Sequence, residues 1–145
     1  MIYSYNDSLG FQVNKTANIM RSRFNHFLKP YGLTAEQYVI LKAISENTCI
    51  TPSQLADILS KDKTTITRMI DTLVKSDFIQ RQQSISDRRS HTLAYSPKST
   101  TVMAEIIPIT DEVIGKMRKK FQTQELECFL SVLSELSSFD CLEEL

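Results

Sequence analysis

The chain has 145 residues, of which 41% are hydrophobic and 23% charged, and its 17 Lys and Arg balance its 17 Asp and Glu. This length predicts one compact domain or protomer, and we expect no second enzyme-sized domain. The sequence has neither a secretory signal nor an apolar run that could span a bilayer, so we expect a cytoplasmic protein that does not contact membranes.

The cysteines and histidines do not have the spacing of a metal site. Cys49, Cys128 and Cys141 form no CxxC pair, and His26 and His91 form no HExxH or HxxxH motif. We therefore expect reduced, mostly buried thiols, with no metal ion and no cofactor. The sequence also lacks a nucleophile elbow, a phosphate-binding loop and paired catalytic carboxylates, so we expect that the protein is not an enzyme.

The charge is unevenly distributed along the chain. By residue count the net charge is +2 over residues 1–50, +2 over residues 51–95 and −4 over residues 96–145. Electrostatic steering depends on the charge near a contact more than on the whole-chain balance. A mildly basic middle segment therefore favours local contact with nucleic-acid phosphates.

Three helices are expected in the first part of the chain. Apolar residues recur every three or four positions over Leu9–Leu28, which predicts an amphipathic helix. The sequence TAEQ predicts a second helix that is capped by Thr34 and ends near Asn47. The sequence TPSQ predicts a short third helix over Pro52–Leu59, with proline at its first position.

A fourth helix and a hairpin follow. Asp62 is a good N-cap for a helix that runs to about Ser76 and has an apolar stripe on one side. Two alternating segments, Phe78–Gln83 and Thr92–Tyr95, predict strands on either side of SISDRRS. A helix-turn-helix followed by a hairpin is a winged helix, so we expect a mainly α fold, a winged helix-turn-helix with a small β-hairpin wing.

Two more helices are expected after the wing. Helical spacing of apolar residues returns between Lys98 and Phe121, and Pro108 inside this pattern should bend the helix. Thr123 can cap a last helix that has Phe129 and several leucines on its apolar side.

One side of the Asp62–Ser76 helix has short hydroxyl groups and cations. Threonine offers a donor, an acceptor and a methyl group to a base edge, and arginine can bridge guanine O6 and N7. We therefore expect DNA contacts from Lys63, Thr64, Thr65, Thr67, Arg68 and Lys75. The alternative is that this surface is merely polar. Threonine has a low helix propensity, however, so repeated threonines are unusual in a helix whose surface has no function.

The tip of the hairpin contains Asp87, Arg88 and Arg89. A hairpin beside a recognition helix lies where the neighbouring minor groove would pass, and arginine suits that narrow, negative groove. Asp87 can orient an arginine through a charge-assisted hydrogen bond. The alternative is a solvated, charged turn.

Several stretches of the chain resemble the MarR family of bacterial transcriptional regulators. They are LGF at 9–11, YGLTAEQYVILKAI at 31–44, LADILSKDKTTITRMIDTLVKSDFIQR at 55–81 and SDRRS at 86–90. The resemblance implies major-groove contacts by Thr64, Thr65, Thr67 and Arg68. It also implies that Arg89 enters the minor groove, with Asp87 bracing it and Arg88 nearer the backbone.

Two turns depart from the family pattern. Asp77 stands where the family usually has a glycine after the recognition helix, and SPKS at 96–99 replaces a glycine-containing turn after the second strand. Both turns must therefore form without the conformational freedom of glycine.

Family members are homodimers whose first and last helices interlock. We accordingly expect residues 1–145 to form one protomer, with residues 34–96 as the DNA-binding region and residues 1–33 and 97–145 as the dimerisation helices. The first and last helices of one protomer are too few to bury all of their apolar side chains. This favours burial against a second copy over the alternative of an intramolecular core. These apolar side chains are those of Phe11, Val13, Phe121, Phe129, Leu130 and Leu133.

These features together indicate a dimeric DNA-binding regulator, a repressor on a palindromic promoter operator. The resemblance implies release by a small aromatic or phenolic effector. An effector crevice could be lined by Met20, Phe24, Phe27, Tyr31 and Tyr38, although these residues would serve equally well as core. Two alternatives stay open: a winged helix that binds protein, and an architectural dimer without an effector.

Overall fold

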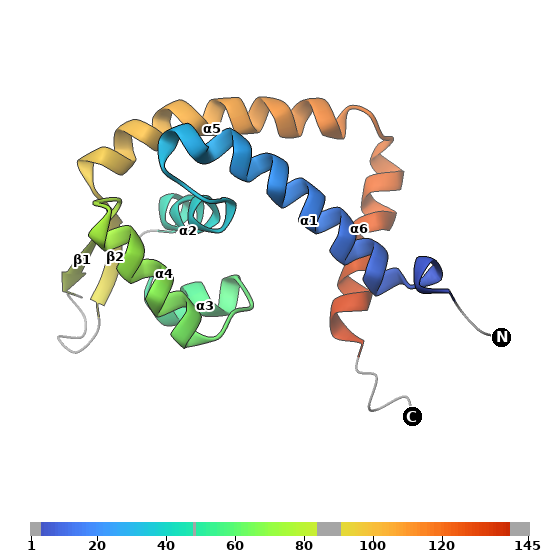
Figure 1. The fold of residues 1–145 in the computed structure, drawn as a ribbon, viewed down its shortest axis with the longest axis horizontal. Helices are drawn as coiled ribbons and strands as arrows, with labels where there is room; N and C mark the ends of the chain where they lie inside the picture. The colour runs from blue at the N-terminus through green and yellow to red at the C-terminus, as the bar shows by residue number, and fades with distance from the viewer. Residues whose placement is uncertain (1–3, 48, 84–90, 140–145) are drawn as a thin grey trace. The chain divides into compact units, whose positions relative to one another are not determined.

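The computed structural model describes residues 4–47, 49–83 and 91–139, and it confirms the mainly helical winged helix-turn-helix (Figure 1). The helices of the first part are α1 (Leu9–Leu28), α2 (Ala35–Glu46), α3 (Pro52–Ile58) and α4 (Lys63–Lys75). The hairpin consists of β1 (Ile79–Gln83) and β2 (His91–Tyr95), and the last helices are α5 (Pro97–Arg118) and α6 (Thr123–Ser138). Short 3-10 turns, Tyr5–Asp7 and Lys29–Tyr31, flank α1.

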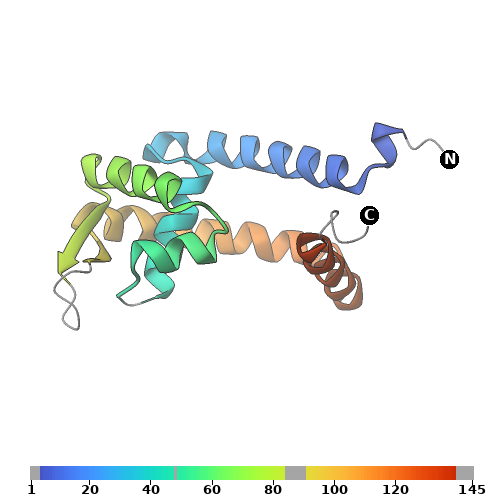
Figure 2. The same ribbon diagram turned by 90° about the horizontal axis from the view of Figure 1, so that it is seen from below.

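The internal contacts divide the chain into two compact units, Met1–Met103 and Ala104–Leu145. The first unit contains α1 to α4, the hairpin and the start of α5, and the second contains the rest of α5 and α6. Within the first unit, α3 packs against α4, and β1 follows α4 after a short turn (Figure 2). No helix in the described ranges has the length and apolarity needed to cross a membrane.

The expected capping motifs begin α2 and α3. Thr34 accepts a hydrogen bond from the backbone N–H of Gln37 at 3.2 Å, and the Gln37 side chain accepts one from the N–H of Thr34 at 2.9 Å. Thr51 and Gln54 form the same reciprocal pair at 3.2 and 2.9 Å. These local bonds satisfy N–H groups that have no partner within a helix, which is why the sequence predicts both starting points.

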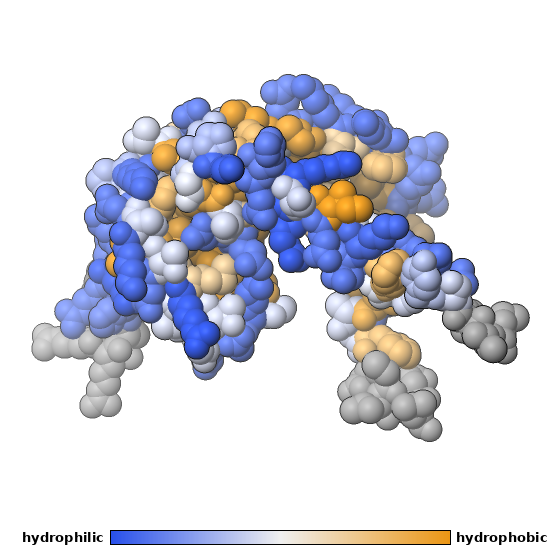
Figure 3. All heavy atoms as spheres, viewed as in Figure 1, coloured by the Kyte–Doolittle hydropathy of each residue, from blue (hydrophilic) through white to orange (hydrophobic). Residues whose placement is uncertain are grey.

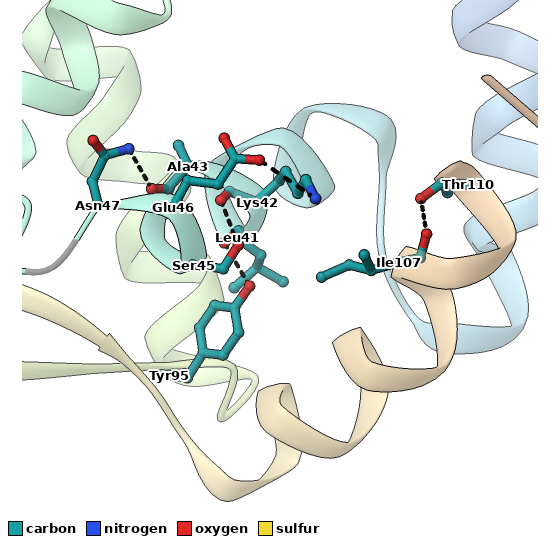
Figure 4. A network of polar contacts seen from close by, with 9 residues as sticks. All are labelled: Leu41, Lys42, Ala43, Ser45, Glu46, Asn47, Tyr95, Ile107 and Thr110. Atoms are coloured by element: carbon teal, nitrogen blue, oxygen red, sulfur yellow. Dashed lines mark hydrogen bonds and ion pairs between the residues drawn. The ribbon is translucent and has the colours of Figure 1, made fainter. Parts of the chain in front are cut away.

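The hairpin is tied to the helices at its base. Its antiparallel register runs from Ile79 opposite Tyr95 to Gln83 opposite His91. The N–H of Leu93 donates to the carbonyl of Ile50 at 2.9 Å, which fixes the segment before α3 beside β2. The hydroxyl of Tyr95 donates to the carbonyl of Leu41 at 2.6 Å (Figure 4), and burial raises the pKa of Tyr95 above its usual value.

The turn between α4 and β1 forms without glycine. Asp77 has a φ of 61°, in the left-handed region. Its N–H donates to the carbonyl of Val74 at 3.0 Å, and the N–H of Phe78 donates to the carbonyl of Leu73 at 2.8 Å. These two bonds are those of a Schellman motif, the usual way to end a helix with one left-handed residue.

The SPKS segment supplies further hydrogen bonds to this turn. Ser96 Oγ donates to the carbonyl of Asp77 at 2.5 Å, and Lys98 Nζ donates to the carbonyl of Ser76 at 2.7 Å. The Ser99 hydroxyl donates to the carbonyl of Phe78. Lys98 Nζ also lies 4.2 Å from the centre of the Phe78 ring, a cation–π contact. The replacement of a glycine turn by SPKS therefore gives the carbonyl groups at the end of α4 side-chain partners.

The junction of the last two helices differs from the expectation. The long helix ends at Arg118, before Phe121, and α6 has its N-cap at Gln122 and not at Thr123. The physical reason is that Glu125 accepts a hydrogen bond from the N–H of Gln122 at 2.8 Å, so Thr123 becomes the first helical residue.

The expectation of mostly buried thiols is wrong for the two cysteines in the described ranges. Cys49 and Cys128 are both exposed. Cys49 lies in the loop before α3 with a φ of 63°, and Cys128 lies on an α6 surface where almost every side chain is exposed. Cys141 lies outside the described residues.

We predict that Asp77→Gly raises the free energy of unfolding by about 0.5–1 kcal/mol, because glycine adopts the left-handed conformation without steric strain. Urea denaturation followed by circular dichroism measures this change. Ser131→Gly in the exposed middle of α6 is the matched control and should lower stability by roughly the same amount. An unchanged or lower stability of Asp77→Gly would contradict the strain at this turn.

Candidate nucleic-acid interface

The N-terminus of α4 is held by Asp62. Its carboxylate accepts hydrogen bonds from the Oγ1 of Thr65 at 2.6 Å and from the N–H of Thr65 at 2.8 Å. Both bonds hold the pKa of Asp62 below its usual value, and the bond from the Thr65 hydroxyl has the larger effect. The cap fixes the first turn of α4, and it uses the hydroxyl proton of Thr65 within the protein.

The α4 helix has one buried and one exposed side. Ile66, Ile70 and Leu73 are completely buried. The exposed side has the residue types expected for contact with a base edge or a phosphate. Its exposed residues are Lys63, Thr64, Thr67, Arg68, Thr72 and Lys75. The structure therefore brings five of the six expected α4 contact residues to one surface, and it leaves Thr65 half-buried at the cap.

Two of the exposed threonines bond to their own helix. Thr67 Oγ1 donates to the carbonyl of Lys63 at 2.7 Å, and Thr72 Oγ1 donates to the carbonyl of Arg68 at 2.9 Å. With their hydroxyl protons used in this way, these side chains can offer lone pairs and a methyl group to an approaching ligand. A fixed rotamer of this kind presents the threonine methyl in one direction, as contact with a thymine methyl requires.

The cations of α4 keep their charge available. Arg68 and Lys75 form no ion pair with any of the described residues, whereas Asp71 pairs with Arg81 of β1 at 2.5 Å. Sequence reasoning missed Arg81. The signal for it was the strand alternation, because Arg81 shares a side of β1 with the buried Ile79.

The expected wing contacts Asp87, Arg88 and Arg89 lie outside the described residues. The strands that precede and follow them are described as far as Gln83 and from His91. The wing contacts accordingly stay a prediction.

The aromatic residues expected around an effector crevice lie together in the first unit. The rings of Phe24 and Tyr38 meet edge to face with centres 5.0 Å apart, and those of Phe24 and Phe27 stack at 6.0 Å. The ring of Tyr31 lies 6.0 Å from that of Phe27. Tyr38 is buried, whereas Met20 is 50% exposed. The four rings thus form one chain of contacts in which Tyr38 is buried and Phe24, Phe27 and Tyr31 are half-buried, and Met20 stays at the surface.

The sequence comparisons point to one family. The model of the MarR family matches residues 33–91, which cover α2, α3, α4 and β1. The multiple antibiotic resistance protein MarR of Escherichia coli K12 is 34% identical over 92 residues, which make up 63% of this chain and 61% of that protein. Over this region the chain is similar to the MarR family. Members of this family are transcription regulators and not enzymes.

Solved MarR structures have the same fold. A MarR protein from Peptoclostridium difficile is 26% identical, with a TM-score of 0.79 over 94% of this chain and 90% of that one. A mutant MarR from Escherichia coli complexed with operator DNA is 22% identical, with a TM-score of 0.79 over 93% and 99%. The present chain spans about three fifths of the length of the curated MarR protein from Escherichia coli that it matches.

We predict that the Asp62 cap stabilises the protein in a pH-dependent way. A carboxylate whose folded pKa is depressed contributes stability above its unfolded pKa, near 3.8, and loses that contribution as the pH falls through the folded value. The difference in unfolding free energy between the wild type and Asp62→Ala should therefore be constant near neutral pH and shrink in acid. Urea titrations between about pH 3 and pH 7 measure it. Asp62→Asn, a cap that does not titrate, is the control and should show no such acid loss relative to Asp62→Ala.

Proposed function

We propose that the protein is a dimeric transcriptional regulator that binds double-stranded DNA through α4 and the wing. The observation that carries the proposal is the outer side of α4, opposite a fully buried apolar stripe. This side has exposed threonines and cations that pair with no anion in the described part of the chain. The match to the MarR family model supports it, as does the operator DNA in the complex of a structurally similar MarR. In this proposal, Lys63, Thr64, Thr67 and Arg68 reach the major groove and Lys75 a phosphate, while Arg89 enters the minor groove.

The dimer is supported by exposed apolar side chains on the helices of both units. On α6, Phe129 is 58% exposed and Leu130 is 56% exposed. Phe11 and Val13 of α1 and Phe121 before α6 are exposed as well, and Figure 3 shows hydrophobic side chains at the surface over α5 and α6. Apolar surface of this extent is costly in water and is normally buried in an interface. A twofold dimer would present two copies of α4 to a palindromic operator with half-sites about one helical turn apart.

Repression and its release are the finer parts of the proposal. A dimer on a promoter palindrome would block transcription, and a small aromatic or phenolic effector would release it by changing the separation of the two α4 helices. The cluster of Phe24, Phe27, Tyr31 and Tyr38, with Met20 at its margin, supports such a site by its chemistry. Titrating the DNA complex with phenol or benzoate and following the fraction bound tests this part, and no release at any concentration would reject it.

A second candidate function is a winged helix that binds protein, or an architectural dimer without an effector. The whole-chain charge of zero favours it, since DNA-binding proteins are usually basic. Salt dependence separates the candidates, because only the neutralisation of phosphates releases many counterions.

We predict that affinity for the DNA flanking this protein's own coding region falls steeply between about 50 and 200 mM salt. Arg68→Ala should weaken binding about tenfold or more, because a bidentate contact with guanine contributes roughly 1–3 kcal/mol. Fluorescence anisotropy with a labelled fragment measures both effects. Lys116→Ala removes a cation of α5 that pairs with Glu112 and should change neither affinity nor slope. Binding that ignores both salt and Arg68→Ala would favour the protein-binding alternative.

We predict that Leu130→Asp turns the dimer into monomers and weakens DNA binding by about a hundredfold, because a charge would have to be buried in the apolar interface. Sedimentation velocity gives the oligomeric state. Ser131→Asp adds the same charge at the next residue, about 100° round the helix and away from the apolar stripe, and should stay dimeric. A wild-type protein that sediments as a monomer at micromolar concentration would refute the dimer.

A further inference from the structure

Arg81 and Asp71 connect the wing to the recognition helix. An Nη atom of Arg81 lies 2.5 Å from Oδ1 of Asp71, and the two side chains are 40% and 45% exposed. Asp71 lies in the middle of α4 and Arg81 in the middle of β1, ten residues further along the chain. The proposed DNA contacts involve neither residue.

The strand geometry explains why a cation meets α4 at this place. Successive side chains of a strand point to opposite sides, so Arg81 lies on the same side of β1 as Ile79. Ile79 is 2% exposed, and Leu93, which pairs with Arg81 across the hairpin, is 3% exposed. Arg81 therefore carries a partly exposed charge on the same side of the hairpin as the buried Ile79 and Leu93, at the margin of the apolar core.

Asp71 pairs across elements although cations of its own helix are near. Arg68 precedes it by three residues and Lys75 follows it by four, and both spacings permit an ion pair on a helix. Neither forms one among the described residues. Asp71 thus ties the hairpin to α4 and leaves the two outward cations unneutralised.

We infer that the Asp71–Arg81 pair is a positioning device that fixes the angle between the wing and α4, so that both can reach one duplex. This inference rests on the proposed function. The base of the hairpin is already attached to the end of α4 through the bond from Ser96 to the Asp77 carbonyl. β2 is also held by the bonds from the Tyr95 hydroxyl to the Leu41 carbonyl and from the Leu93 N–H to the Ile50 carbonyl. These bonds lead to α2 and to the loop before α3, whereas the ion pair links β1 to α4 itself, at the level of Leu93. Because the pair is exposed, its contribution to overall stability is small, and its effect lies in the direction of the wing.

Asp71→Asn and Arg81→Gln test the device with little change in size. Each should weaken promoter binding about tenfold, and the double variant should be no weaker than either single variant, because the link is already broken. The thermal unfolding temperature should stay nearly unchanged. Asp71→Asn removes a negative charge from the DNA-facing helix, so electrostatics alone would strengthen binding, and a weaker complex can be attributed to lost positioning.

The epistasis with the wing separates positioning from a general structural role. If the pair acts by directing the wing, Asp71→Asn should cause almost no further loss of promoter affinity in an Arg89→Ala background. If Asp71→Asn instead causes a general structural defect, it should lower the affinity of Arg89→Ala by the same factor as that of the wild type. The salt dependence of binding tests whether Arg81 itself contacts DNA. If it does not, the slope of log affinity against log salt concentration should be the same for Arg81→Gln and for the wild type. A slope that is shallower by about 0.9 in Arg81→Gln would mean that Arg81 itself neutralises a phosphate, and it would overturn the inference.

Glu36→Gln is the matched control. It breaks the exposed ion pair between Lys61 and Glu36, which has a distance of 3.1 Å and exposed fractions of 34% and 45%, without touching the hairpin. Its affinity for the promoter should equal that of the wild type. A wild-type protein that does not bind promoter DNA refutes the proposed function, whereas a wild type that binds and an Asp71→Asn variant that binds equally well refute only the positioning role.

Discussion

The burial of the apolar stripe of α4 is the interaction on which the rest of the structure depends. Ile66, Ile70 and Leu73 have no exposed surface, and each contributes roughly 1.5–3 kcal/mol to folding. Their burial fixes the rotation of α4 about its own axis. With the helical period, that rotation determines that Thr64, Thr67, Arg68 and Lys75 point outward. The surface that would read DNA is therefore a consequence of core packing.

The end of α4 shows how a family turn can be rebuilt from other residues. Asp77 takes the left-handed conformation that glycine would take at lower cost. The side chains of Ser96, Lys98 and Ser99 donate to the three carbonyls around it, and Ser96 and Ser99 are themselves completely buried. The buried hydroxyls have partners, so the desolvation of polar groups is compensated. Strain at one residue is thus offset by hydrogen bonds from a segment about twenty residues away.

The sequence predicts those features that are determined locally. The caps at Thr34, Thr51 and Asp62 involve residues three positions apart, and a spacing of three can be read directly from the chain. The ion pair between Asp71 and Arg81 requires the hairpin register and the packing of α4, which no local pattern contains. The sequence pattern places the start of α6 one residue late, because the bond from the Gln122 N–H to Glu125 makes Gln122 the N-cap in place of Thr123.

The balanced charge constrains how such a protein can recognise DNA. With 17 cations against 17 anions, long-range attraction to a duplex is weak, and the local excess in residues 51–95 is only +2. Affinity must then come from short-range contacts, whose energies fall off over a few tenths of an ångström. Contacts of that kind require side chains that are already in place. The Thr65 bonds that fix the first turn of α4, the threonine hydroxyls bonded to the helix and the ion pair at Arg81 all reduce conformational freedom beside the outward cations. A DNA-binding protein with a small net charge can compensate for weak long-range attraction if its contact side chains lose little conformational entropy on binding.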